Sequence, residues 1–279
     1  MKNNFVLFTV LLAAVVLSGC KKEEDQTTYY EQEYPPTAIV IKQAVTDYDG
    51  NIYDAVQIGD QIWMASNLRT KHYADGTAIW ENRGTWSICY TGYYGEGLTT
   101  IHGYRYNLSA ALRGGVYPGI TVFYDDEENP PRVQGICPNG WHLPNAEEFR
   151  QLCYSINNNV EVEDEYTHQS AEDIYNQVET GKALAARQEW EPSGQQYGIG
   201  NNLNSNNATG FSALPCAPYS DEERTEMDRA EFHTCTYSDG EYGGMVWTFS
   251  IHNKYGVEFS STWRPVGGCS DACVRCVKD

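Results

Sequence analysis

The chain has 279 residues and a formal net charge of −19, because 38 acidic side chains outnumber 19 basic ones. A surface this acidic repels nucleic acid and anionic lipid headgroups, which excludes proteins that bind either of them by charge. The length suits one domain, or one domain with long insertions.

The first twenty residues predict an export signal followed by a lipid anchor. Lys2 gives a basic start, and Phe5 to Leu17 is an apolar run of thirteen residues. Such a run is the size of a signal-peptide core and is too short to cross a hydrocarbon layer of roughly 30 Å comfortably. It ends in the sequence LSGC over residues 17–20, which resembles the bacterial lipobox. We therefore expect residues 1–19 to be a lipoprotein signal peptide and Cys20 to be the lipid-anchor residue, since two or three acyl chains hold a protein stably on a membrane. The alternative is an ordinary cleaved signal with an incidental cysteine.

A polar segment follows the anchor. Residues 21–25 have the sequence KKEED, which is similar to the signal that sends Bacteroidetes lipoproteins to the outside of the outer membrane. The alternative is the start of a solvated linker. Residues 20–37 have the composition of a flexible tether and contain Pro35 and Pro36 near their end. We expect a lipid-anchored outer-membrane protein, exposed at the cell surface, whose domain occupies residues 38–279.

The domain begins with short apolar stretches separated by turn residues. Asp-Gly and Gly-Asp pairs in the turns supply the positive φ that hairpins need. Six stretches are predicted as strands: Ile39 to Val45, Tyr53 to Ile58, Gln61 to Ala65, Met245 to Ser250, Gly256 to Ser260 and Cys273 to Val277.

One helix is predicted from Asn145 to about Asn157. Asn145 can cap its first turn, and Glu148 lies three residues later, as in a capping box. Apolar residues then recur at the spacing of one helix face: Phe149, Leu152, Cys153 and Ile156.

A second helix is predicted to start at Ser170, with Ala171, Ile174 and Val178 facing inward. Gly181 leaves its continuation open. Together with the predicted strands and many irregular stretches, these two helices indicate an α+β fold with long loops.

Eight cysteines remain besides Cys20, and an even number in an exported protein favours disulfides. They are Cys89, Cys137, Cys153, Cys216, Cys235, Cys269, Cys273 and Cys276.

The sequence leaves the roles and pairing of these cysteines open. A metal site at Cys269, Cys273 and Cys276 is one alternative, but it lacks the second ligand pair that zinc sites normally have. Free buried thiols are another alternative, and Cys153 can be either a buried thiol or half of a bridge. If Cys273 to Val277 is a strand, Cys273 and Cys276 face opposite sides and bond to different elements.

Five motifs stand in order along the chain: VQIGDQIWMASNLRT at 56–70 with YADGT at 73–77, CY at 89–90, ICPNGWHLP at 136–144, GFSALP at 210–215 and VRCVKD at 274–279. In this order they resemble the Fibrobacter succinogenes major paralogous domain, a family abundant in Bacteroidetes and Fibrobacteres. The resemblance covers roughly residues 45–279. It implies structural roles for five residues within the motifs: Trp63, Trp141, His142, Pro144 and Arg275.

The chain departs from the family pattern in two places. Trp247 stands alone near the last strands, where the family usually has two tryptophans. The acidic segment 221–231 looks like an insertion beside Cys216 and Cys235, which a bridge between these two cysteines would pin.

The sequence WHLP at residues 141–144, which precedes a predicted helix, is also similar to the corresponding element of C-type-lectin-like and formylglycine-generating-enzyme-like domains. This resemblance implies a C-type-lectin-like domain, in which a twisted antiparallel sheet carries one or two helices and long disulfide-stapled loops. It also implies a C-terminal strand that lies beside the N-terminal one.

No catalytic residue is assigned, because the sequence holds no Gly-x-Ser-x-Gly, P-loop or His-Glu-x-x-His pattern. His142 lies in a motif without an identifiable carboxylate beside it, so we expect it to hydrogen-bond backbone. No cofactor is predicted. Calcium-dependent sugar binding lacks its usual tripeptides, of which residues 191–193 (EPS) are the nearest approach.

Taken together, these features of the sequence predict a non-enzymatic surface lipoprotein that binds an extracellular glycan or protein. One alternative is a structural or accessory subunit of an envelope or outer-membrane transport complex. The other is a cysteine-dependent enzyme of the formylglycine-generating type, in which Cys269 and Cys273 would bind copper.

Overall fold

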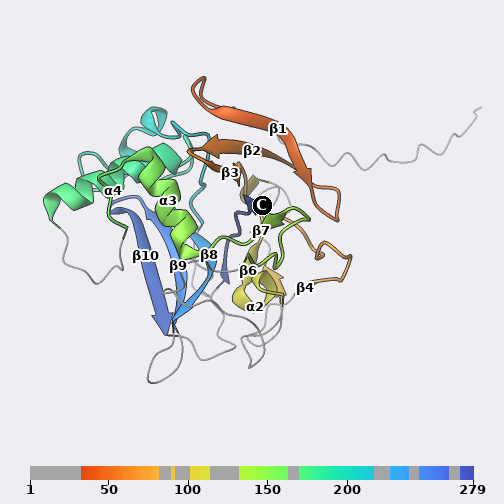
Figure 1. Cartoon of the computed structure of the whole chain (residues 1–279). Helices are drawn as coiled ribbons and strands as arrows, with labels where there is room; N and C mark the ends of the chain where they lie inside the picture. Colours follow the sequence, from red (N-terminus) through yellow and green to blue (C-terminus); the bar gives the residue numbers. More distant parts are fainter. Residues whose placement is uncertain are drawn as a thin grey trace, which may run out of the picture.

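The computed structural model describes residues 33–81, 89–91, 101–113, 132–162, 170–216, 227–238, 245–263 and 271–279 (Figure 1). For residues 80, 81, 89–91, 237, 238, 245 and 261–263 it describes the backbone alone. The predicted signal peptide, Cys20, residues 21–32 of the tether and Cys269 lie outside the described residues.

The largest sheet is antiparallel and joins both ends of the described chain. Its strands are β1 (Ile39–Thr46), β2 (Ile52–Ile58), β3 (Gln61–Met64), β12 (Val277–Lys278) and β7 (Trp141–His142), in the order β1-β2-β3-β12-β7. The hairpin turn between β1 and β2 contains Gly50 at φ 83°. The three predicted N-terminal strands are therefore confirmed.

A second antiparallel sheet contains β8 (Arg229–Ser238), β9 (Met245–His252) and β10 (Gly256–Trp263), with β9 in the middle. The two strands predicted here, at 245–250 and 256–260, are confirmed. Strand β8 was not expected, because its first residues fall in the acidic segment taken for an insertion. Ala230 and Phe232 alternate along it and are buried, which is the signal of a half-buried strand.

The third sheet contains β4 (Trp80–Glu81), β5 (Cys89–Thr91), β6 (Arg105–Asn107) and β11 (Asp271–Ala272), in the order β11-β6-β5-β4. Strands β4 and β5 are parallel, and the other pairs are antiparallel. A short helix, α2 (Leu108–Ala111), follows β6 directly and is capped by Asn107.

The predicted strand from Cys273 to Val277 is wrong over most of its length. Residues 273–276 bond to three different places, since Cys273 N donates to Glu231 O, Leu68 N to Val274 O and Met64 N to Cys276 O. This segment thus crosses between sheets instead of pairing with one strand. The strand that does form, β12, lies between β3 and β7, not beside the N-terminal strand β1 as expected.

Both predicted helices are present. Helix α3 (Ala146–Ile156) has the predicted capping box between Asn145 and Glu148, and contacts β8, β9 and β2 (Figure 1). Helix α4 (Ala171–Leu184) is capped by Ser170 and packs against β10. Two short 3-10 turns, Ile199–Asn201 and Leu203–Ser205, follow it. Among the described helices, none is long and apolar enough to span a bilayer.

One detail of α4 differs from expectation. Ala171 was expected to face inward but is exposed in the first turn, whereas Val178 is buried as expected. The continuation that the sequence left open is present, because the helix runs through Gly181 to Leu184. Gly181 lies opposite Gly256 of β10, and a Cβ on Gly181 would come within 3.1 Å of the Gly256 Cα atom. The missing side chains let helix and strand approach closely.

Aromatic rings fill the larger of two hydrophobic clusters. Trp63 of β3 is fully buried, with ring centroids 4.9 Å from Phe149 and 5.8 Å from Phe211. Phe249 stacks on Phe149 at 4.3 Å. Truncating a buried aromatic of this kind costs about 3–5 kcal/mol, so this cluster fixes α3 between the first two sheets.

Candidate binding pocket

A pocket of about 530 Å³ opens between the N-terminal segment, the residues after β3 and the loops that follow α4. Twelve of its seventeen lining residues carry polar or charged side chains. The lining comprises Glu33, Tyr34, Ile52, Asp54, Ala65, Ser66, Asn67, Arg69, Ile101, Ala186, Arg187, Gln188, Asn204, Asn207, Ser212, Leu214 and Arg275.

Arg275 forms the floor of the pocket and is only 1% exposed. Its guanidinium donates to Asn67 Oδ1 at 2.8 Å and to three backbone carbonyls, those of Met64, Phe211 and Ser212. All four acceptors are neutral. Burial lowers the pKa of Arg275 to about 9, which still leaves it charged at neutral pH. The floor therefore carries a positive charge that is solvated by dipoles.

Side-chain amides and a hydroxyl surround this charge and are held in place by one another. Asn67 accepts from Arg275 and donates through Nδ2 to the carbonyl of His102 at 2.9 Å. Asn207 donates through Nδ2 to Ser212 Oγ at 2.7 Å, and Ser212 N donates back to Asn207 Oδ1 at 2.9 Å. Because these groups are buried and paired, the pocket floor is preorganised.

Asp54 of β2 forms one wall, and its charge is largely compensated. Its Oδ2 atom accepts from the Tyr34 hydroxyl and from Lys42 Nζ, both at 3.1 Å. Its Oδ1 atom accepts from the backbone of Gln43 at 2.7 Å. The ammonium group of Lys42 also lies 4.7 Å from the centre of the Tyr34 ring. Tyr34 is thereby oriented at the pocket edge.

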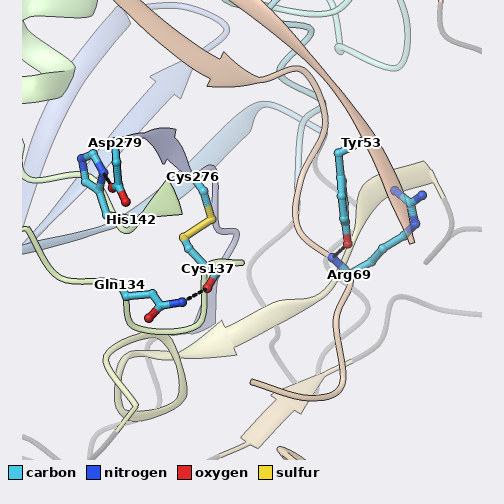
Figure 2. Close-up of a disulfide and its surroundings, with 7 residues drawn as sticks. All are labelled: Tyr53, Arg69, Gln134, Cys137, His142, Cys276 and Asp279. Atoms are coloured by element: carbon cyan, nitrogen blue, oxygen red, sulfur yellow. Dashed lines mark hydrogen bonds and ion pairs between the residues drawn. A yellow bond between two sulfur atoms is a disulfide. The ribbon is translucent and has the colours of Figure 1, made fainter. Parts of the chain in front are cut away.

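The rim adds two more guanidinium groups. Arg69 lies over the ring of Tyr53, with its guanidinium carbon 4.6 Å from the ring centre (Figure 2). Its guanidinium also donates to the Ile52 carbonyl at 3.0 Å. Arg187 is exposed and donates through Nε to Asn206 O at 3.0 Å. Three guanidinium groups and two carboxylates thus line the pocket, on a molecule whose formal charge is −19.

A buried histidine lies directly behind the lining. His102, next to the lining residue Ile101, has its Nε2 atom 2.7 Å from the Oε2 atom of Glu189. Burial lowers the pKa of His102 against the attraction of Glu189. Glu189 has φ 67°, a conformation that non-glycine residues rarely adopt. The contact between His102 and Glu189 therefore holds the turn that presents Arg187 and Gln188.

Among the described residues, one of the predicted disulfides is present. Cys137 and Cys276 are bridged, which joins the segment before β7 to the segment before β12 (Figure 2). The other cysteines with described side chains are buried thiols: Cys153, Cys216, Cys235 and Cys273. The side chain of Cys89 and the whole of Cys269 lie outside the described residues. The three-cysteine metal alternative therefore loses Cys276, which is bridged.

The bridge between Cys216 and Cys235 that the sequence suggested as one option is absent, because both are free thiols. Cys216 belongs to the cluster around Phe232, whereas Cys235 belongs to the other hydrophobic cluster, with Trp141. Their backbone partners differ as well, since Cys216 N donates to Arg229 O and Cys235 N to Pro144 O. The two thiols thus lie in different parts of the core, and no bridge between them closes the segment.

His142 was expected to hydrogen-bond backbone, and this is wrong. Its Nδ1 atom lies 2.8 Å from Asp279 Oδ1 (Figure 2). Its Nε2 atom lies 2.7 Å from Glu148 Oε1. The sequence hid both partners for different reasons. Glu148 was assigned to the cap of α3, which it also forms through Oε2, and Asp279 is 137 residues away.

The remaining motif residues lie in the core, away from the pocket. Trp141 is 4% exposed and pairs with Lys278, and the Pro144 carbonyl accepts from Cys235 N. Arg275, in contrast, is both a core residue and the pocket floor. A charged side chain between Val274 and Cys276 in the last motif was the available sign that this position is special.

In the described part of the chain, no three His, Cys, Asp or Glu side chains gather as a group that could hold a metal ion. The model of the Fibrobacter succinogenes major domain matches residues 56–278. Neither the curated proteins nor the solved structures that were searched contain a match.

Proposed function

The chain belongs to the Fibrobacter succinogenes major domain family, and we propose that it is a non-enzymatic binding protein whose pocket holds an extracellular glycan. The observation that carries this proposal is the lining: a preorganised floor of amides and a guanidinium, with further polar side chains at the rim. Pockets for small organic ligands are mostly apolar. A lining this polar matches a strongly hydrated ligand instead.

Sugars suit such a lining because each hydroxyl both donates and accepts. Amide side chains offer both functions from one group, and Asn204 and Gln188 are exposed at the rim. Tyr34 adds an aromatic side chain that its hydrogen bond to Asp54 orients. The volume of about 530 Å³ lies within the usual range for small-molecule sites, roughly 300–1,000 Å³, and accommodates the end of a glycan chain.

The charges favour acidic sugars over neutral ones. Asp54 is compensated by Lys42, and the positive charge of Arg275 has only neutral acceptors. Arg69 and Arg187 present guanidinium groups, whose donors match a carboxylate. A glycan that carries a uronic acid is therefore expected to bind more tightly than its neutral counterpart.

A lectin-like arrangement of the domain belongs to the same proposal. Its support is the position of α3, which follows residues 141–144 and packs on β8 and β9. The cell-surface location is supported by the sequence alone, through the lipobox-like residues 17–20 and the acidic run after them. Labelling cells with an alkyne analogue of palmitate tests the anchor: Cys20→Ala is expected to lose the label and to leave the outer-membrane fraction.

The binding proposal is tested on a glycan array with the chain from Lys21 onward, which keeps Glu33 and Tyr34. Arg187→Ala and Asn204→Ala change exposed rim residues and are each expected to weaken binding about tenfold, the effect of losing one good hydrogen bond. Arg132→Ala is the control, because Arg132 is an exposed arginine outside the lining. Binding should survive EDTA.

Two outcomes would favour the alternatives. Silence on glycans, together with co-purification of an outer-membrane barrel, would replace the binding role with that of an accessory subunit. Copper uptake that is lost in Cys269→Ser would revive the cysteine-dependent enzyme. Equal loss of binding in Arg132→Ala and Arg187→Ala would place the glycan elsewhere on the surface.

A further inference from the structure

Two buried cysteines from distant parts of the sequence lie along the edge of β8 that does not pair with β9. Cys216 N donates to Arg229 O at 2.7 Å, and Glu231 N lies 3.4 Å from Cys216 Sγ. Cys273 continues along the same edge, because its N atom donates to Glu231 O and its carbonyl accepts from His233 N, both at 3.0 Å. Glu231 thus touches one cysteine through its N–H and the other through its carbonyl.

The side chain of Cys216 approaches the backbone position that Cys273 occupies. Cys216 Sγ lies 4.0 Å from Glu231 O, the atom that Cys273 N also contacts. Both residues are buried in the same hydrophobic cluster, at 1% and 0% exposure.

Their electrostatic surroundings distinguish this pair from the other buried thiols. The hydrogen bond from Cys273, with a contribution from Arg105, lowers the pKa of Cys216 to about 6, and the same bond raises the pKa of Cys273. Arg105 also donates to the Cys216 carbonyl at 3.3 Å. For Cys153 and Cys235, burial raises the pKa. The thiolate, which is the form that attacks a disulfide, is thus favoured at Cys216.

We propose that Cys216 and Cys273 are an oxidation site at which a second disulfide closes. The oxidant is a disulfide of the exported compartment, either small-molecule or protein-borne. Cys216 attacks it as the thiolate and forms a mixed disulfide, with release of one thiol. Cys273 then loses its proton and attacks the Cys216 sulfur, which releases the second thiol. Two cysteine thiols are oxidised, and one disulfide is reduced to two thiols.

Burial decides when this happens. With exposures of 1% and 0%, the pair is closed to an oxidant in the folded protein, so the bond forms during folding or on local opening. Once formed, it ties residue 216, just beyond the pocket loop, to residue 273. Arg275 would then lie between two bridged positions, Cys273 and Cys276, which limits the movement of the pocket floor. The inference does not depend on the proposed glycan.

Peptide mapping of the exported full chain tests it. The protein is denatured with an alkylating reagent, without reduction, and is cut with trypsin and with a protease specific for aspartate. Trypsin cleaves after Arg275 and so separates Cys273 from Cys276. Cleavage at Asp271 separates Cys273 from Cys269. We expect one linked pair that contains Cys216 and Cys273, in addition to the pair of Cys137 and Cys276.

Variants give the matched comparison. In Cys216→Ser, Cys273 is expected to become alkylated, whereas Cys153→Ser is expected to leave the Cys216–Cys273 pair unchanged. Recovery of both cysteines as alkylated thiols would overturn the proposal, if it persists after incubation with oxidised glutathione in mild denaturant. A link from Cys216 or Cys273 to any other cysteine would overturn it too. The peptide map of the wild-type protein tests the Cys216–Cys273 disulfide even where a variant fails to fold.

Discussion

The Nδ1 atom of His142 lies 2.8 Å from the Oδ1 atom of Asp279, so one imidazole joins the start of α3 to the residue after β12. Its other nitrogen contacts Glu148, the residue that closes the capping box. Burial disfavours the imidazolium, but the hydrogen bonds and charges of Glu148 and Asp279 outweigh it, so the pKa of His142 is raised above 6.5.

This raised pKa predicts the direction of a pH effect. A group whose pKa is higher in the folded state stabilises the fold fully below its unfolded pKa, here about 6.5, and loses that contribution as the pH rises through the folded pKa. The difference in free energy of unfolding between wild type and His142→Gln should therefore shrink above about pH 6.5. Urea denaturation across the pH range measures it.

His252 is the matched control with the opposite sign. Burial and the nearby Arg229 lower its pKa to about 4. Its neutral form is favoured in the fold, so its contribution is present above about pH 6.5 and is lost as the pH falls towards 4. Parallel pH profiles for His142→Gln and His252→Gln would contradict the assignment of both environments.

Replacing Arg275 is predicted to destabilise the protein whether or not the charge is kept. In Arg275→Lys, the ammonium group lacks the planar fork of donors with which the guanidinium reaches four acceptors. In Arg275→Met, the buried carbonyls are left without a donor. Each change is expected to lower the free energy of unfolding by about 3 kcal/mol or more. Chemical denaturation measures it, with Arg132→Lys as the exposed control expected within about 0.5 kcal/mol. An unchanged free energy of unfolding in Arg275→Met would contradict the prediction and would show that water replaces the guanidinium as the donor to these carbonyls.

Gly256→Ala and Gly50→Ala separate a steric clash from backbone strain. Both glycines have positive φ, 79° and 83°. A Cβ on Gly256 would come within 2.1 Å of the backbone of Gln177 in α4, whereas one on Gly50 meets nothing within 4 Å. We expect Gly50→Ala to lose about 1 kcal/mol and Gly256→Ala about 3 kcal/mol or more, from thermal or urea unfolding. Equal losses would show that α4 shifts freely away from β10.

Removing the Cys137–Cys276 bridge is predicted to destabilise the domain strongly. The bridge spans 139 residues, and the chain-entropy model gives an upper value of about 5 kcal/mol for a loop of this size. Reduction of the wild type should match the double variant Cys137→Ala/Cys276→Ala in denaturation midpoint. Cys235→Ala, which removes a nearby buried thiol, is the control for lost packing. A double variant no less stable than this control would contradict the prediction.

Features that depend on neighbours in sequence could be predicted. Asn145 and Glu148 are three residues apart, so their capping box follows from the local pattern. The hairpin at Gly50 likewise needs only a residue that tolerates φ 83° between two apolar stretches. The lipid anchor at Cys20 rests on the same kind of local signal and remains a prediction, because it lies outside the described residues.

Features that depend on distant partners needed the tertiary structure. Arg275 becomes the floor of a pocket because residues 64, 67, 211 and 212 bring their oxygens around it. Cys137 meets Cys276 across 139 residues. Apolar periodicity shows which face of an element is buried but not which element covers it. The partners are chosen only when all the elements pack at once, and for this protein that choice created the pocket.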